Sequence, residues 1–96
     1  MSVAVLFGPA EMSRETYRRI AEAMKRDGDW PPRGLHYHAT FGDSGRLRTY
    51  EVWESVHDLE AFGARLRTVF AEHGVNAPTP LVSELVAEEG PSDALT

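Results

Sequence analysis

Residues 34–54, GLHYHATFGDSGRLRTYEVWE, decide the fold, because they predict a β-hairpin whose two faces differ in chemistry. The central cluster Gly42-Asp43-Ser44-Gly45 is rich in turn-forming residues. The runs on either side of it are rich in β-branched and aromatic residues, which favour strands. The hairpin therefore supplies two neighbouring strands of a sheet.

A four-residue turn sets the predicted register, and a two-residue loop at Asp43-Ser44 gives the same pairs. The predicted pairs include Phe41 with Arg46, His38 with Thr49 and His36 with Glu51. Because side chains alternate along a strand, each face collects every second residue. One face holds His36, His38, Thr40, Leu47, Thr49, Glu51 and Trp53, and the other holds Leu35, Tyr37, Ala39, Phe41, Arg48, Tyr50 and Val52.

The bulk composition limits the class of protein. Ninety-six residues, 42% of them hydrophobic and 26% charged, suit one small globular domain. A net charge of -5 argues against nucleic acid as a partner, because phosphate binding needs clustered Lys and Arg. The absence of cysteine excludes disulfides and thiolate metal sites. No basic leader and no run of membrane-spanning length is seen, so we expect a cytoplasmic protein without membrane contact.

The rest of the chain predicts two helices and two further strands. The continuous apolar run at residues 3–7 is typical of a buried strand. A helix over about residues 14–27 begins after the N-cap Ser13, and a second helix occupies about residues 55–74. Residues 81–86 then form a last strand, preceded by prolines that suit a strand start.

The order of these elements, β-α-β-β-α-β, predicts an α+β ferredoxin-like fold, in which a four-stranded antiparallel sheet carries both helices on one face. The domain spans residues 1–86, and residues 87–96 are expected to form a mobile acidic tail. The other sheet face would stay bare, and large apolar faces are rarely left in water. We therefore expect a homodimer whose sheets pair face to face. Its predicted interface residues are Tyr37, Phe41, Tyr50 and Val52.

The sequence also resembles a known group. Residues 51–55, EVWES, lead into residues 59–62, LEAF, and this pattern is similar to the strand tryptophan, helix cap and helical aromatic of small antibiotic biosynthesis monooxygenase-like proteins, within the dimeric α+β barrel superfamily. Residues 34–38, before the turn, are similar to small actinobacterial members of this group. The resemblance covers about residues 2–86 and implies face-to-face sheet dimers with a ligand cleft between sheet and helices. It puts Trp53 on the cleft side. Gly63 stands where haem-degrading members carry a histidine, so haem degradation is not expected.

Three polar residues share the face of Trp53 and suggest chemistry. General acid–base catalysis suits two histidines beside a carboxylate, because histidine titrates near neutral pH and the carboxylate can fix its tautomer. The same trio could ligate a metal, or could form an ordinary cross-strand cluster without chemistry. We expect neither a metal nor a cofactor. The predicted catalytic residues are His38, His36 and Glu51, and the predicted substrate-binding residues are Trp53, Thr49 and Trp30.

The resemblance implies a small-molecule enzyme that acts on an aromatic or polyketide-like substrate by cofactor-independent oxygenation. Two alternatives stay open: a cyclase or isomerase that uses a histidine acid–base, and a non-catalytic ligand-binding or accessory domain. Fold alone does not separate these classes. Trp30, in the proline-rich loop before the hairpin, is either a lid over the ligand or a plug at the end of the sheet.

Overall fold

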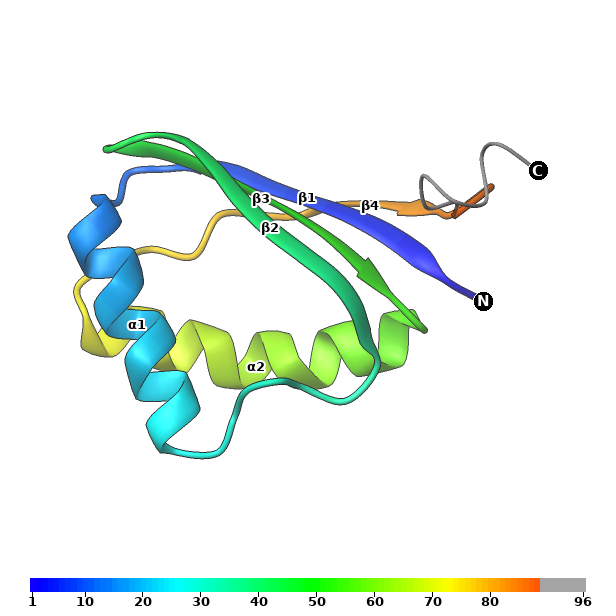
Figure 1. Ribbon diagram of the computed structural model, residues 1–96, viewed down its shortest axis with the longest axis horizontal. Helices are drawn as coiled ribbons and strands as arrows, with labels where there is room; N and C mark the ends of the chain where they lie inside the picture. Colours follow the sequence, from blue (N-terminus) through cyan, green and yellow to red (C-terminus); the bar gives the residue numbers. More distant parts are fainter. Residues whose placement is uncertain (89–96) are drawn as a thin grey trace.

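The computed structural model describes residues 1–88, in which both helices lie on one side of a curved sheet (Figure 1). In chain order, the elements are β1 (Val3–Ala10), α1 (Arg14–Arg26), β2 (Leu35–Asp43), β3 (Arg46–Trp53), α2 (Val56–Glu72) and β4 (Leu81–Glu84). The strand order is β2-β3-β1-β4, with antiparallel neighbours throughout. The predicted ferredoxin-like fold is therefore confirmed. Of the predicted acidic tail, residues 89–96 lie outside the described part of the chain.

Both helices begin where their caps predict. The Ser13 hydroxyl accepts a hydrogen bond from the Thr16 amide at 3.0 Å, and the Ser55 hydroxyl accepts one from the Asp58 amide at 3.1 Å. Each bond satisfies an amide that has no partner inside its helix. The strands fit less closely, since β1 runs three residues beyond its predicted end and β4 stops two residues short of its own.

The register of the β2–β3 hairpin differs from the prediction by two residues. Asp43, and not Phe41, pairs with Arg46, so that only two residues form the turn. The turn is held from outside the hairpin, because the Gly45 amide donates to the Met12 carbonyl at 2.9 Å, just before α1. A shift of two residues preserves the alternation of side chains, so most residues of both strands keep their predicted faces.

A β-bulge at His36 changes the faces at the start of β2. Leu35 pairs with Trp53, and the register shifts immediately afterwards. Leu35 therefore packs against the buried cluster around Trp53, on the face that the sequence assigned to His36. The predicted pairing of His36 with Glu51 is wrong, because the two-residue shift in register places Glu51 opposite His38. The bulge leaves His36 without a partner in the pairing of β2 with β3.

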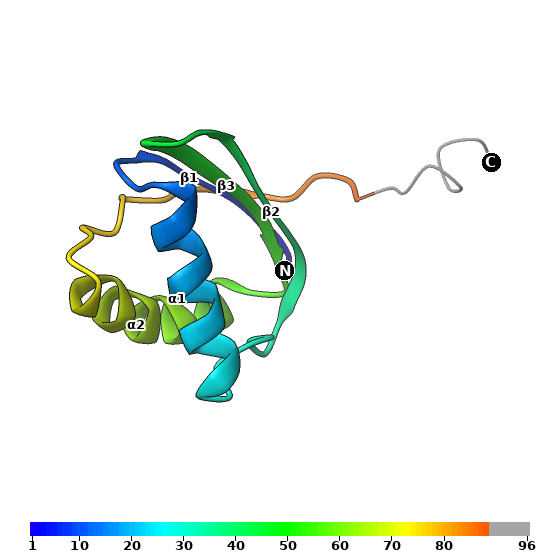
Figure 2. The same cartoon turned by 60° about the vertical axis from the view of Figure 1, so that its left-hand side comes forward.

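The core between sheet and helices consists of two buried clusters. The first contains Ala10, Met12, Ile20, Met24, Val69 and Phe70, and the second contains Val3, Val5, Trp53 and Leu59. Phe62 of α2 packs against both clusters, so it joins them into one continuous core. Figure 2 shows the arrangement of the helices around this core: α1 and α2 lie at an angle to one another beneath the concave side of the sheet.

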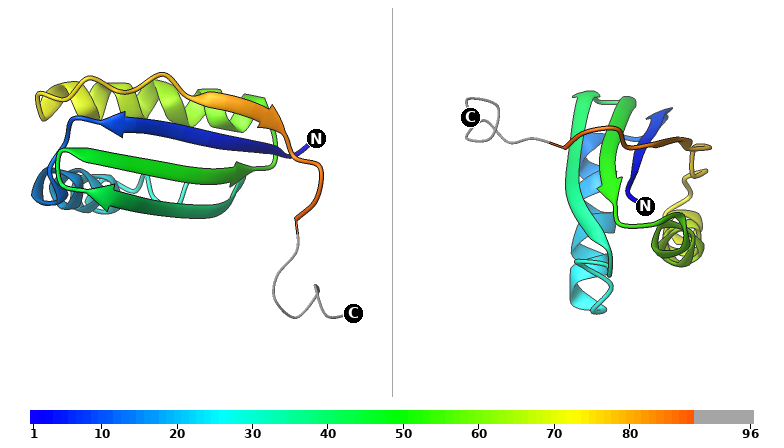
Figure 3. Two further views of the ribbon diagram at one scale, coloured as in Figure 1. Left: turned by 90° about the horizontal axis from the view of Figure 1, so that it is seen from above. Right: turned by 90° about the vertical axis from the view of Figure 1, so that its right-hand side faces the viewer.

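The convex face of the sheet carries no helix, as the view from above shows (Figure 3, left). Tyr37 and Phe41 are about half exposed on β2, and Tyr50 of β3 lies edge-to-face with Tyr37. Val52, in contrast, is only 4% exposed within a single chain, so it belongs to the packing of the sheet and not to its free surface. Within residues 1–88, neither helix combines the length and the apolar content needed to cross a membrane.

Candidate functional site

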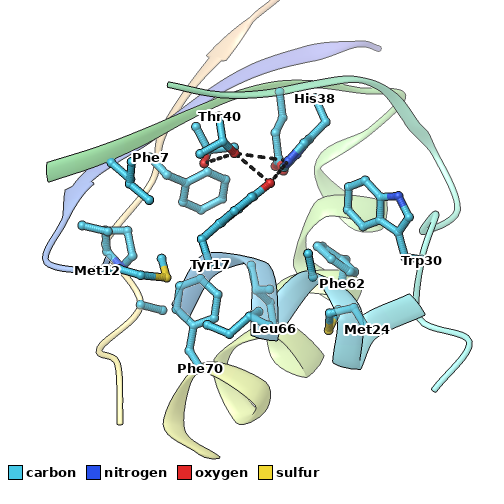
Figure 4. A pocket seen from close by; sticks show the side chains of 18 of the residues that line it. Phe7, Met12, Tyr17, Met24, Trp30, His38, Thr40, Phe62, Leu66 and Phe70 are labelled. Atoms are coloured by element: carbon cyan, nitrogen blue, oxygen red, sulfur yellow. Dashed lines mark hydrogen bonds and ion pairs between the residues drawn. The ribbon is translucent and has the colours of Figure 1, made fainter. Parts of the chain in front are cut away.

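A cavity of about 250 Å³ lies between the sheet and the two helices (Figure 4). Apolar side chains from β1, both helices and the loops before and after α1 form most of its wall. They include Phe7, Met12, Ile20, Met24, Trp30, Phe62, Leu66 and Phe70. The polar residues of the lining are Tyr17, Lys25, His38, Thr40, Thr49 and Glu51. The cavity is slightly smaller than the 300–1,000 Å³ or so that is usual for ligand pockets, which indicates a compact ligand.

Glu51 is the buried charge of the site. Its side chain is 4% exposed, and both carboxylate oxygens accept hydrogen bonds. Oε2 accepts from Nδ1 of His38 at 2.8 Å, and Oε1 accepts from the indole N–H of Trp53 at 2.9 Å. A buried carboxylate needs such partners, because an unpaired charge is strongly disfavoured away from water. The predicted proximity of His38 and Glu51 on one face is therefore seen, with Glu51 directly opposite His38 in the sheet.

Tyr17 is a polar residue of the cavity that the sequence did not single out. Its hydroxyl lies 3.0 Å from Nε2 of His38 and accepts a hydrogen bond from the Thr40 hydroxyl, also at 3.0 Å. Thr40 in turn lies 3.1 Å from the Thr49 hydroxyl. Figure 4 shows the Tyr17 ring rising from α1 so that its hydroxyl meets the sheet residues. Tyr17 recurs with Ile20, Ala21 and Met24 at helical spacing, and this apolar stripe predicts only a buried helix face. A tyrosine on a stripe that faces polar strand residues is the signal that could have revealed it.

Of the two tryptophans predicted to bind substrate, only Trp30 lines the cavity. Trp53 is fully buried, packs against Phe62 at a centroid distance of 5.5 Å, and is not part of the cavity lining. Trp53 therefore does not form the expected aromatic wall, whereas its neighbour Phe62 does line the cavity. Trp30 lines the cavity instead, with its ring edge-to-face with His38 at 4.9 Å.

His36 stands apart from the other predicted catalytic residues. Its ring is 37% exposed, and Nδ1 lies 4.0 Å from a carboxylate oxygen of Glu88. His36 is not part of the cavity lining, whereas Thr49 is. Across the described residues, no three side chains of His, Asp or Glu gather closely enough to hold a metal ion, so the alternative metal trio of His36, His38 and Glu51 does not assemble.

The loop that carries Trp30 is attached to α2 by an ion pair. Arg65 donates from Nε to Asp29 at 2.9 Å, and its Nη2 lies 3.6 Å from Asp27. The hydrogen bond to Asp29, together with the negative charge of that residue, raises the pKa of Arg65 above its ordinary value. Arginine is charged at any physiological pH, so this ion pair ties the loop to α2 next to Trp30, which lines the cavity.

Replacing Arg65 with Gln is expected to loosen residues 27–34, because the change removes the charged partner of Asp29 and preserves most of the side-chain length. Hydrogen–deuterium exchange should become several-fold faster in this loop and stay unchanged in β1 and β3. The matched control is Arg67→Gln on the same helix, where no ion pair is found in residues 1–88. Equal protection of the loop in wild type and Arg65→Gln would contradict this role of Arg65.

Neither a protein-family model nor a curated protein matches the sequence of this chain. Its fold does match solved structures. A candidate antibiotic biosynthesis monooxygenase from Chloroflexus aurantiacus J-10-fl has a TM-score of 0.64 at 13% sequence identity, covering 94% of this chain and 98% of that chain. A monooxygenase from the gene ActVA-Orf6 of Streptomyces coelicolor, solved with the ligand nanaomycin D, has a TM-score of 0.59 at 16% identity, covering 94% and 91%.

A third match is a candidate antibiotic biosynthesis monooxygenase from Caulobacter crescentus CB15, with a TM-score of 0.58 at 16% identity, covering 92% of this chain and 91% of that chain. At such identities the likeness establishes the arrangement of the backbone, because fold is shared by proteins of many functions. The fold is thus the one predicted from the sequence resemblance, that of antibiotic biosynthesis monooxygenase-like structures.

Proposed function

We propose that the chain is a small-molecule enzyme of the antibiotic biosynthesis monooxygenase-like type, which oxygenates an aromatic or polyketide-like substrate in the cavity beneath the sheet without a cofactor. The observation that carries the proposal is the row of hydrogen bonds from Glu51 through His38 to Tyr17, which ends in a largely apolar cavity. The nanaomycin D complex of a protein with the same fold supports a small-molecule ligand.

The proposed chemistry begins with removal of an acidic substrate proton. This proton passes to the Tyr17 oxygen while the hydroxyl proton of Tyr17 moves to Nε2 of His38. The imidazolium formed in this way stays paired with the Glu51 carboxylate, which is already its hydrogen-bond partner. The role of Glu51 is therefore to hold the tautomer of His38 and to stabilise its charged form.

The substrate anion is the species that reacts with dioxygen. It is electron-rich, and the aromatic and aliphatic walls keep water away from it. Conversion of a ring C–H of a phenol to a quinone carbonyl consumes one dioxygen and releases one water, with one oxygen atom entering the product. Trp30 and Phe62 offer flat surfaces against which a planar ring can pack.

Oxygen uptake with a panel of polyphenols and anthrone-type compounds tests this proposal. We expect one dioxygen to be consumed for each quinone formed, and labelled dioxygen should leave one labelled atom in the product. A product formed equally well without oxygen would instead favour the cyclase or isomerase alternative. Binding without any turnover across the panel would favour the non-catalytic ligand-binding domain.

We also propose that two copies of the chain pair through the convex face of the sheet. Support comes from the exposed aromatic side chains of Tyr37, Phe41 and Tyr50, which gather on a face that no helix covers. Burial of such a surface is favourable because apolar area leaves water. Helices already cover the opposite face, so pairing of the convex faces would leave the cavity of each chain intact.

Light scattering should give the mass of a dimer at micromolar concentration, and Phe41→Glu should shift it towards monomer because the change buries a charge at the contact. The fold should tolerate this change, since Phe41 is half exposed and pairs with Arg48 across the hairpin. Val56→Glu is the control, an equally drastic change at an exposed apolar residue on the helical side. A wild-type chain that is monomeric at this concentration would rule out the interface.

A further inference from the structure

The direction of every hydrogen bond in the polar corner of the cavity is fixed by one residue. The Glu51 carboxylate has acceptors only, and both of its oxygens are occupied. Neutral His38 therefore carries its one proton on Nδ1, which donates to Glu51, and its Nε2 atom presents a lone pair. This assignment follows from the chemistry of the carboxylate and does not depend on the ligand.

The next bonds follow in the same direction. Since Nε2 of His38 can only accept, the Tyr17 hydroxyl donates to it. The Thr40 hydroxyl also lies 3.4 Å from Nε2 of His38, but it donates over the shorter distance of 3.0 Å to the Tyr17 oxygen, and its proton is then used. Thr49 must consequently donate to Thr40 across their 3.1 Å contact. Each of the three hydroxyl protons is thus donated to the next residue along the chain of hydrogen bonds that leads to Glu51. The hydroxyl oxygens keep free lone pairs.

The remaining side-chain donors of the lining lie away from this corner. Lys25 is an exposed residue of α1, so its ammonium belongs to the mouth of the cavity. Figure 4 shows the Trp30 ring with its nitrogen on the side away from the Tyr17 hydroxyl. The inner corner therefore offers acceptors to a ligand and, in its resting state, no free hydroxyl proton.

We infer that the cavity selects a ligand that donates a hydrogen bond at this corner: a neutral phenol or enol O–H, in preference to a ketone, a quinone or a carboxylate. A carbonyl oxygen placed there would face the lone pairs of the hydroxyl oxygens. The inference rests on the proposed function, because the donated proton is the one that the Tyr17–His38 pair removes. It also predicts weak retention of a product in which that hydroxyl has become a carbonyl.

Binding under anaerobic conditions tests the preference without turnover. Calorimetric titration compares 1-naphthol with 1-tetralone, two compact bicyclic probes that present a hydroxyl donor and a carbonyl acceptor at the same position. We expect 1-naphthol to bind roughly 10- to 100-fold more tightly, the factor that corresponds to one satisfied against one unsatisfied buried polar group. Equal affinities, or no binding of 1-naphthol at millimolar concentration, would overturn the inference.

The variant Glu51→Gln should reverse the preference. Its amide oxygen can still accept from Trp53, but its NH₂ group must donate to Nδ1 of His38. The proton of His38 then moves to Nε2 and donates to Tyr17, so the Tyr17 hydroxyl is free to donate to a ligand. We expect 1-tetralone to bind at least as tightly as 1-naphthol in this variant. The control Glu54→Gln, at an exposed carboxylate, should retain the wild-type preference.

Nitrogen-15 NMR of the His38 ring detects the position of its proton without any ligand. We expect the proton of neutral His38 on Nδ1 in the wild type and on Nε2 in Glu51→Gln. A wild-type ring that carries its proton on Nε2 would overturn the inference. If the tautomer and the binding preference are as expected but no bound phenol consumes oxygen, the inference stands and the proposed oxygenation fails.

Discussion

Changing His38 to Ala is expected to lower turnover of an accepted substrate by roughly 10²- to 10⁴-fold, the range usual for a general acid–base group. The imidazole links the only buried carboxylate of residues 1–88 to the hydroxyl that faces the cavity. Without it, Tyr17 has no acceptor for its proton, and the substrate anion forms only by loss of a proton to water. Steady-state oxygen uptake with the best substrate of the polyphenol panel measures the effect.

Two comparisons separate chemistry from packing in this experiment. Tyr37→Phe alters the neighbouring residue on the opposite face of β2, so its activity should stay near that of the wild type. Tyr17→Phe retains the ring and removes only the hydroxyl, so it should lose activity while preserving the wall of the cavity. Equal losses in the His38 and Tyr37 variants would contradict the assignment of the catalytic face.

The alternation of side chains in the hairpin was predictable, whereas its register was not. The period of two along each strand placed His38, Thr49 and Glu51 on one face, because that period follows from backbone geometry alone. The register depends on the turn, and the turn is fixed by contacts with the start of α1. The Arg14 amide donates to the Ser44 hydroxyl at 3.3 Å, a bond between residues 30 positions apart that no local pattern contains.

The bulge at His36 shows the same limit at the other end of β2. The sequence places His36 and His38 equivalently, two residues apart in a strand, and alternation alone assigns both to the cavity. The structure separates them because Leu35 packs into the buried cluster with Trp53. Burial of a leucine is favoured over burial of a histidine, and one extra residue in the strand satisfies that preference.

The contribution of the helices to the site could be predicted only in part. The caps and the apolar stripe located α1, and Tyr17 lay on that stripe. Which sheet residue Tyr17 would meet depends on the position of the helix beneath the sheet, and this position is set by side-chain packing in three dimensions. The cavity itself is a volume that packing leaves unfilled, so no pattern along the chain reports it.

Trp53→Ala should be the most damaging of the single changes for stability. Trp53 is fully buried, and replacing a buried tryptophan with alanine typically costs about 3–5 kcal/mol. The change also removes the N–H that Glu51 accepts at Oε1, and a buried group that loses its partner adds a penalty of about 1–3 kcal/mol. Since small domains are stable by only about 5–15 kcal/mol, we expect a large fraction of the variant to be unfolded without denaturant.

Urea unfolding at a fixed protein concentration measures this loss, with Trp53→Phe and Trp30→Ala as comparisons. Trp53→Phe retains most of the packing and loses the N–H, so it should fall between the wild type and Trp53→Ala. Trp30→Ala should lower the free energy of unfolding by less, because Trp30 is only half-buried. One side of its ring faces the cavity and has few packing contacts to lose. A Trp53→Ala chain within about 1 kcal/mol of the wild type would show that Trp53 is not the centre of the second core cluster, since even one buried methylene contributes nearly that much.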